Sequence, residues 1–588
     1  MQMPAMPAVL PDVRLDARTG DRWACVMLGL MASLPFLQPW HDLPLTSFHA
    51  EWLAAVCGLF GMLFLLPRPA ASPLLVPAIT VAPLALVALA MLQLAAGKFA
   101  YAASGVLLAL YLLWAGGLAV AGRTLAASMG AAPLLARLAW AMVAGGMVSA
   151  AFGLLQYKGW WSAFGGLVST PQPVAEYGVF GNLSQQNHFA TYEALALASC
   201  AYLALTGQLA LRRALTCGAV LLAVLALSGS RSMLLYLAWL LGAGLLLAPV
   251  TGRLQHLHRW LRIAVLVMVA AVIVLAVAAR ITPTGLGPQL TRLVSPQNGA
   301  FGPRMFYWEH ALHMFMSHPW LGVGFDSFAL QLEAQLTAPA RFAVDQYAHN
   351  LPLQLMAAAG LPGVLALAVP VLLFAVRLGR QPRTMERLYL CGALGILLIH
   401  SMLEQPLHYA YFLGLAALLA GIADPSGRQL RANTIAVLAL VALLFTAVKT
   451  ARDHAAIREQ FEQGEAAADL ALRARTLHHI RDYSLLAPLS ELIGPEVFVA
   501  GDAPVAARRA LNERVLHFAP TDEVAFRHAA LLAEEGRMAD AQAQLRRATL
   551  AYPESAAAYL ARIDALAAAE PAVYGALAAY GRQLQSTR

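Results

Sequence analysis

A histidine lies at the start of a long apolar run, in the stretch DQYAHNLPLQLMAAAG, which covers residues 345 to 360. Asn350 can cap a helix that begins there. Pro352 suits the first turn, because backbone N–H groups at that position have no partner within the helix and proline lacks one. His349 then lies just outside the helix, beside the positive end of the helix dipole, which disfavours the imidazolium. The pattern therefore predicts a neutral imidazole near pH 7 that can act as a general base.

Two arginines occupy comparable positions in other segments. In SGSRSMLLYLAWL, Ser228 or Ser230 can act as N-cap, which places Arg231 in the first turn of a helix. In FGPRMFYWEHALHMFMSHPW, Pro303 suits the first helical position and Arg304 falls in the opening turn. A positive charge in the first turn of a helix is unfavourable by about 0.3–1 kcal/mol, because the helix dipole is positive at that end. A bound anion would make the same position favourable, since the free N–H groups and the guanidinium would both point at it. Two such arginines and a histidine base suit a pyrophosphate-bearing substrate and a hydroxyl acceptor.

The helix that carries Arg304 is predicted to be amphipathic. At about 100° per residue, Glu309, His310, His313 and Ser317 share one face, and Arg304 is directed away from this polar row. We expect the helix to lie at the membrane interface on the outer side. Two histidines spaced i, i+3 do not by themselves predict a metal site, and the five cysteines show no disulfide or zinc spacing.

Further polar side chains lie where apolar runs begin on the same side. The stretches FGNLSQQNHFATY and LEQPLHYAYF contribute amides, a histidine, an acid and a tyrosine. These candidates are Gln185, Gln186, Asn187, His188, Glu404 and Tyr409. Such groups are poor at facing lipid, so we interpret them as active-site candidates. A simple helix cap is the alternative for Asn187.

The elements that position these residues are membrane spans. Of the 588 residues, 60% are hydrophobic and 12% are charged, against about 25% charged in soluble domains. The net charge of +8 does not indicate nucleic-acid binding, because the basic residues lie in short loops between apolar runs. About thirteen runs approach the length of a span, roughly 20 residues. They cover 23–40, 50–66, 73–95, 100–121, 135–156, 187–208, 214–229, 231–249, 263–280, 350–376, 388–403, 409–423 and 432–449.

The arginines also predict the orientation and the domains. They gather in alternate loops, so the tail at 1–22 is predicted to be cytoplasmic, and an odd number of spans leaves the C-terminus outside. The predicted fold is all-α, with a transmembrane domain at 23–449 that includes a long outward loop at 281–349. Residues 450–588 are predicted to be a soluble helical domain, in which 521–553 matches the length of one tetratricopeptide-type repeat. Such a domain either binds a peptide or caps the membrane domain.

Five motifs follow one another in the order of a known family. They are GNLSQQNHFATYEALAL, SGSRSMLLYLA, GPRMFYWEHALHMFMSHPWLGVGFDSF, YAHNLPLQLMAAAGLPG and EQPLHYAYFLG. Across residues 150–425 the sequence resembles the bacterial protein O-oligosaccharyltransferases that glycosylate pilins, within the O-antigen ligase superfamily. The elements around Arg304 and His349 are shared across that superfamily, whereas the GN…Q…NH stretch favours a protein ligase.

The resemblance implies a multi-pass enzyme of the Gram-negative inner membrane, with its active site and C-terminus in the periplasm. The implied donor is an undecaprenyl-pyrophosphate-linked oligosaccharide held in membrane lipid, and the implied acceptor is Ser or Thr of a pilin-like protein. No metal or cofactor is expected. The implied site residues are His349 as catalytic base, Arg231 and Arg304 as diphosphate ligands, and Tyr409 with either Gln185 or Gln186.

Other functions remain open at this point. A lipid A-core O-antigen ligase would use the same donor with a sugar acceptor, and a polysaccharide polymerase is a further neighbour. A transporter or flippase of a lipid-linked or anionic solute would place polar residues near the bilayer midplane, whereas here they gather on one side. A non-catalytic scaffold would leave the two arginines at helix starts unexplained.

Overall fold

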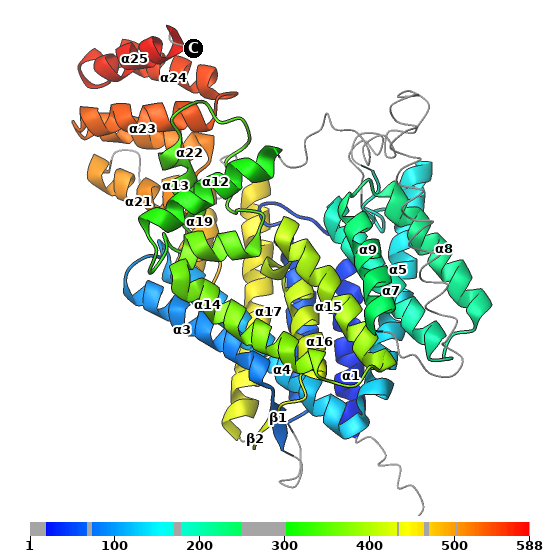
Figure 1. The fold of residues 1–588 in the computed structure, drawn as a ribbon. Helices are drawn as coiled ribbons and strands as arrows, with labels where there is room; N and C mark the ends of the chain where they lie inside the picture. The colour runs from blue at the N-terminus through cyan, green and yellow to red at the C-terminus, as the bar shows by residue number, and fades with distance from the viewer. Residues whose placement is uncertain are drawn as a thin grey trace, which may run out of the picture.

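The computed structural model of the chain describes residues 19–66, 73–169, 178–247, 302–431, 434–463, 470–499 and 503–586. Within these ranges it confirms the predicted class, an all-α polytopic membrane fold (Figure 1). Six of the described helices are long and apolar enough to cross a membrane. They are α3 (Val81–Ala95, with the turn before it), α4 (Ala102–Met129), α5 (Ala131–Lys158), α14 (Leu351–Gly379), α15 (Met385–Leu403) and α17 (Thr434–Gln463).

Shorter helices complete the membrane domain. The apolar ones are α2 (Phe48–Leu63), α9 (Ser232–Leu247) and α16 (Ala410–Ala423). The runs expected at 23–40, 187–208 and 214–229 correspond to α1 (Thr19–Met31), α7 (Gln186–Leu205) and α8 (Leu211–Leu227). The span expected at 263–280 lies outside the described residues, as do most of the N-terminal tail and the first part of the outward loop.

Small residues let α16 pack closely on its neighbours. A Cβ added to Gly421 would clash with the carbonyl oxygen of Ala119, so α16 rests directly on the backbone of α4. Gly414 of α16 and Gly58 of α2 both press against the ring of Trp114. Because interiors are close-packed, these contacts fix the position of α16 and of the turn that leads into it from α15.

A break in α14 receives the HPWLGVG motif that follows α12 (Gly302–Ser317). Gly360 has a φ of 66°, a conformation that favours glycine, and Leu361 N donates to the carbonyl of Pro319 across the break (2.8 Å). Gln93 of α3 donates to one backbone carbonyl on each side of this junction (2.8 and 2.9 Å). The motif therefore joins α12, which has Arg304 in its first turn, to α14, which begins just after His349.

Short strands and basic residues mark one end of the bundle. β1 (Leu74–Val76) pairs antiparallel with β2 (Arg428–Leu430), at the end of the bundle opposite the C-terminal helices (Figure 1). Arg123 of α4 donates to the carbonyl of Ser426 (2.9 Å), and Arg377 of α14 pairs with Asp424 (3.0 Å). Both arginines were predicted to lie in loops that face the cytoplasm, whereas the structure places them within α4 and α14.

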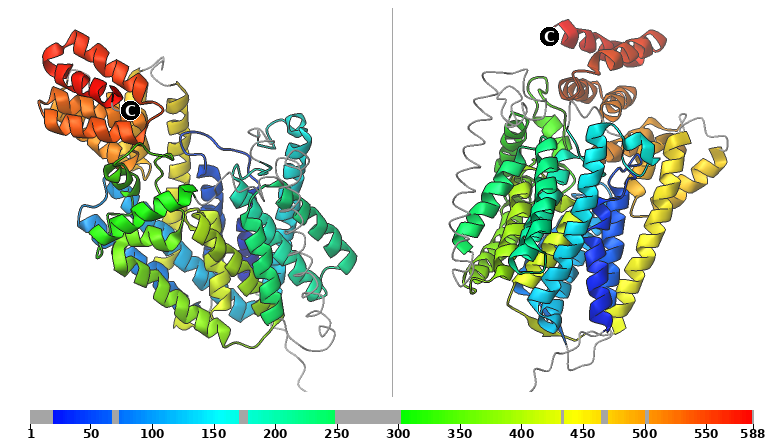
Figure 2. Two further views of the ribbon diagram at one scale, coloured as in Figure 1. Left: turned by 45° about the horizontal axis from the view of Figure 1, so that its top comes forward. Right: turned by 90° about the vertical axis from the view of Figure 1, so that its right-hand side faces the viewer.

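The C-terminal helices lie beyond the opposite end (Figure 2). α17 continues past the boundary expected at residue 450. The helices after it are α18 (Leu470–Tyr483), α19 (Ala487–Ile493), α20 (Pro495–Phe498), α21 (Val505–Phe518), α22 (Asp522–Glu534), α23 (Met538–Ala551), α24 (Ala556–Ala569) and α25 (Pro571–Ser586). α22 and α23 form a helix-turn-helix across Gly536 within the repeat expected at 521–553. Its assignment to the tetratricopeptide type stays a prediction.

The C-terminal helices contact part of the loop at 281–349 that was predicted to face outward. Gln544 of α23 donates to Glu333 of α13 (Phe328–Gln335) at 2.9 Å. The Ser327 hydroxyl lies 2.6 Å from Nε2 of His517, in α21. These bonds join the C-terminal helices to the loop that continues to His349.

Candidate active site

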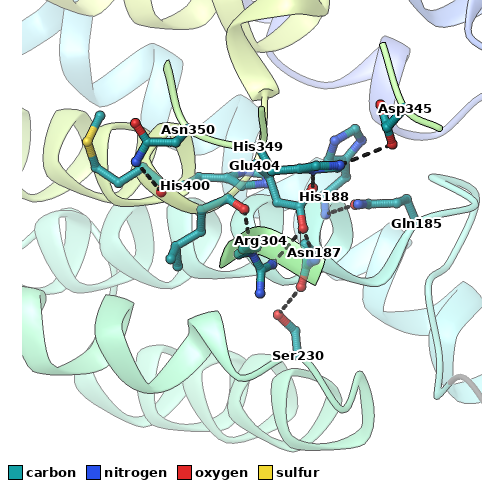
Figure 3. Close-up of polar contacts among 12 residues, drawn as sticks. Gln185, Asn187, His188, Ser230, Arg304, Asp345, His349, Asn350, His400 and Glu404 are labelled. Carbon is teal, nitrogen blue, oxygen red and sulfur yellow. Dashed lines mark hydrogen bonds and ion pairs between the residues drawn. The ribbon is translucent and has the colours of Figure 1, made fainter. Parts of the chain in front are cut away.

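Glu404 connects three of the predicted residues at the C-cap of α15. Its Oε1 accepts hydrogen bonds from Arg304 (2.8 Å) and Asn187 (3.1 Å), and its Oε2 lies 2.9 Å from Nδ1 of His349 (Figure 3). Arg304 also donates to the carbonyl of Leu403 (2.8 Å). Side chains from α7, α12, α15 and the loop before α14 therefore meet at one carboxylate, and we call these four side chains the Glu404 cluster.

The start of α14 positions His349. Asn350 is the N-cap, as predicted: its side chain accepts from an N–H in the first turn (3.1 Å) and donates to a backbone carbonyl of α15 (3.0 Å). His349 has a φ of 52°, which is uncommon for a residue with a side chain. Its ring lies between Glu404 and Asp345, with Nε2 at 3.1 Å from Asp345 Oδ2.

The predicted neutral state of His349 is wrong for this conformation. Burial lowers the pKa of His349, but the hydrogen bonds and negative charges of Asp345 and Glu404 outweigh burial and raise the pKa to about 9. The prediction considered only the dipole of the helix that follows, an effect of about 0.3–1 kcal/mol. Two carboxylates in hydrogen-bond contact are stronger, so the imidazole is protonated near pH 7.

Glu404 is ionised between two cations. Burial alone would raise its pKa, but the hydrogen bond from His349 and the positive charges of His349 and Arg304 lower the pKa of Glu404 to about 2. The charges of Asp345 and Glu404 balance those of the imidazolium and the guanidinium. Buried charges are tolerated when they are paired and hydrogen-bonded in this way.

Arg231 lies one residue before α9. The prediction placed it in the first turn, but α9 begins at Ser232. The two candidate caps also bond elsewhere, because Ser228 is the C-cap of α8 and Ser230 Oγ donates to Asn187 Oδ1 (2.6 Å). The residue next to Arg231 thus touches the Glu404 cluster.

The QQNH stretch opens α7, and its residues differ in role. Gln185 is the N-cap, since its side chain accepts from the N–H of His188 (2.6 Å). The cap considered for Asn187 therefore belongs to Gln185, while Gln186 begins the helix and is partly exposed. The ring of His188 lies 4.7 Å from that of Tyr409. The structure brings Asn187 into the cluster and leaves His188 and Tyr409 packed together beside it.

α12 presents its polar row away from the cluster. Glu309, His313 and Ser317 are exposed. Arg304 points away from this row, as predicted, and meets the end of α15, where it donates to the carbonyl of Leu403. Nδ1 of His310 bonds to a carbonyl of its own helix (2.8 Å). In the part of the chain that the structure describes, no three His, Cys, Asp or Glu side chains are grouped to hold a metal ion.

Known proteins share these segments. A family model described as O-antigen ligase matches residues 216–368, and one described as the C-terminal part of a virulence-factor membrane-bound polymerase matches 388–563. The general O-oligosaccharyltransferase of Acinetobacter baylyi is 22% identical over 445 residues, which cover 72% of this chain and 74% of that protein. The chain belongs to the O-antigen ligase and oligosaccharyltransferase superfamily. The two matched regions of this superfamily member include Arg304, His349 and Glu404.

The sequence did not lead us to predict one residue of the candidate site, Asp345. Asp345 contacts His349 from four positions earlier in the chain, within the stretch at 345–360. A carboxylate so near a candidate base was a usable signal. The contact of Ser230 with Asn187 had no such signal, because 43 positions separate the two residues.

Proposed function

We propose that the protein is an O-linked oligosaccharyltransferase that moves a glycan from undecaprenyl pyrophosphate to Ser or Thr of a periplasmic protein such as a pilin. The observation that carries this proposal is the shared partner: Glu404 joins a candidate base, His349, to a candidate diphosphate ligand, Arg304. Displacement of a diphosphate from a sugar carbon needs both functions at one place. The likeness to a protein named general O-oligosaccharyltransferase supports the same activity.

In the proposed reaction, Nε2 of His349 takes the proton of the acceptor hydroxyl while Nδ1–H donates to Glu404, which orients the ring. The acceptor oxygen bonds to the anomeric carbon as the bond from that carbon to the phosphate oxygen breaks. A single displacement inverts the anomeric centre. Arg304 and Arg231 stabilise the negative charge that develops on the departing diphosphate, which is preorganised electrostatic catalysis.

The position of the cluster supports a periplasmic active site in the inner membrane. Arg123 and Arg377 lie at the strand end of the bundle, and basic residues favour the cytoplasmic side. The Glu404 cluster joins α12 to the C-cap of α15, and α12 lies at the other end of the bundle, near the C-terminal helices (Figure 1). A flippase or transporter fits less well, because its polar groups belong near the midplane.

A lipid A-core O-antigen ligase is the second candidate function, because the O-antigen ligase model matches 216–368. It would use the same donor and the same displacement. The C-terminal helices favour the protein acceptor, since they hold the loop that leads to His349 through Gln544 and His517. A helical surface so close to the site can present a polypeptide.

A reconstituted transfer assay tests the proposal and separates the two candidates. The purified protein receives a polyprenyl-diphosphate glycan together with either a pilin or lipid A-core, and mass spectrometry follows the glycan. We expect transfer to pilin, with His349→Ala slower by at least about 100-fold. His313→Ala, on the exposed side of α12, is the matched control. Transfer to lipid A-core alone would support the second candidate, and normal transfer by His349→Ala would refute the base.

A further inference from the structure

Carboxylates occupy both ring nitrogens of His349. Nδ1 lies 2.9 Å from Glu404 and Nε2 lies 3.1 Å from Asp345. A neutral imidazole carries one N–H, so it can donate to only one of the two carboxylates, whereas the imidazolium donates to both. This conformation therefore stores a proton at the atom that has to accept one in the proposed function.

The two carboxylates differ in how firmly they are held. Glu404 accepts hydrogen bonds from side chains on three separate segments, and its side chain is 14% exposed. The Asp345 side chain is 36% exposed, and its Oδ1 accepts a hydrogen bond from the N–H of Tyr347, two residues along the same loop (3.2 Å). Moving Asp345 away from His349 breaks hydrogen bonds within one loop. Moving Glu404 away would break hydrogen bonds to three separate segments.

We propose that Asp345 is a latch on His349 that covers Nε2 until the acceptor hydroxyl displaces it, while Glu404 stays in place and orients the ring. This inference rests on the proposed function. When Asp345 withdraws, the Nε2 proton passes to bulk water and the free nitrogen faces the hydroxyl. The imidazole has lost one of two negative neighbours, so it holds a proton less tightly. Displacement of the latch thus prepares the base, and Asp345 acts as a positioning residue.

Among the groups around His349, Asp345 is the charged side chain in contact with Nε2. Arg304 acts through Glu404, on the Nδ1 side. The ring of Tyr307, from α12, lies 5.3 Å from the His349 ring, and burial with the nearby charge of Asp345 raises the pKa of Tyr307 to about 12. Burial and neighbouring carboxylates likewise raise the pKa of Tyr409 to about 12. Both tyrosines stay neutral over the pH range in which His349 titrates.

The pH dependence of transfer tests the latch. We expect kcat/KM of the wild type to rise with pH toward about 9, in line with the raised pKa of His349. In Asp345→Ala the rising limb should move to lower pH by about one unit or more, with the maximal rate kept within a few-fold. Asp482→Ala removes a carboxylate from a surface ion pair with Arg481 on α18 and should leave the limb in place. An unmoved limb in folded Asp345→Ala overturns the latch, and so does inactivity at every pH.

A chemical readout needs neither donor nor acceptor. Diethyl pyrocarbonate modifies neutral imidazole nitrogens, and mass spectrometry of the peptide that contains His349 gives the rate, with exposed His313 as internal reference. At pH 7 we expect His349 to react at least about tenfold faster in Asp345→Ala than in the wild type, as a shift of about one pKa unit requires. Equal rates overturn the latch. If His349→Ala transfers glycan normally, the proposed base fails while this rate still reports on the Asp345 contact.

Discussion

Two partly buried arginine–carboxylate pairs lie at opposite ends of the same group of helices. Arg304 pairs with Glu404 at the C-cap of α15, and Arg377 pairs with Asp424 at the C-cap of α16. Burial favours the neutral acid in both, yet the bonded partners lower the pKa of each carboxyl group. The same interaction therefore occurs twice in one protein, in two different settings.

The remaining partners distinguish the two pairs. Asp424 accepts from the N–H of Ile79 (3.0 Å) and from the N–H and hydroxyl of Ser426 (3.1 and 2.7 Å), so it ties the loop after α16 to the turn before α3. Glu404 instead accepts from an amide and a histidine side chain that can meet a substrate. A buried ion pair alone does not identify an active site, and the chemistry of its further partners does.

The largest contrast is expected when each carboxylate is made neutral. Glu404→Gln should lower glycan transfer by about 100-fold or more, because His349 loses the carboxylate that orients its ring. Asp424→Asn should keep the transfer rate per folded molecule but lower the free energy of unfolding by about 1–3 kcal/mol, since buried donors lose a charged acceptor. Transfer assays and thermal unfolding of the same detergent-purified samples measure both effects.

The reverse pattern would remove the distinction between the two ends. Two outcomes would contradict this distinction: loss of transfer in folded Asp424→Asn, or normal transfer by Glu404→Gln. The Glu404 cluster would then have only a structural role, like the Arg377–Asp424 pair.

A smaller contrast is expected when each arginine becomes lysine. Arg304→Lys should slow transfer by about 10- to 100-fold, because an ammonium cannot donate to Leu403 and Glu404 and still bind a diphosphate in a forked geometry. Arg377→Lys should leave transfer unchanged and reduce stability by about 1 kcal/mol. Titration with a polyprenyl diphosphate separates weaker donor binding from unfolding. Equal donor affinity in wild type and Arg304→Lys would count against a diphosphate ligand at this position.

The smallest contrast concerns one hydroxyl at each end. Ser230→Ala removes the donor to Asn187 (2.6 Å) and should reduce transfer by a few-fold, as the loss of one hydrogen bond of about 1 kcal/mol predicts. Ser426→Ala removes a bond to Asp424 (2.7 Å) and should reduce only stability, by a similar amount. Identical rates for both variants would place Ser230 outside the active site.

Local features of the site were readable from the sequence because they depend on neighbours a few positions away. The cap by Asn350 and the opening-turn position of Arg304 follow from such neighbours, and the structure has both. The apolar runs predicted an all-α membrane fold for the same reason, since each helix satisfies its own backbone hydrogen bonds in lipid. The start of α9 differed by one residue because its candidate caps bond to other groups.

The site itself was decided by tertiary structure. Glu404 meets His349, Arg304 and Asn187 across 55, 100 and 217 positions of the chain, and no local pattern encodes those encounters. The charge of His349 shows the consequence. Its own helix dipole predicts a neutral ring, whereas two carboxylates brought close by folding raise its pKa to about 9. Electrostatic interactions act through space, so the proton on His349 depends on the fold and not on the order of the residues.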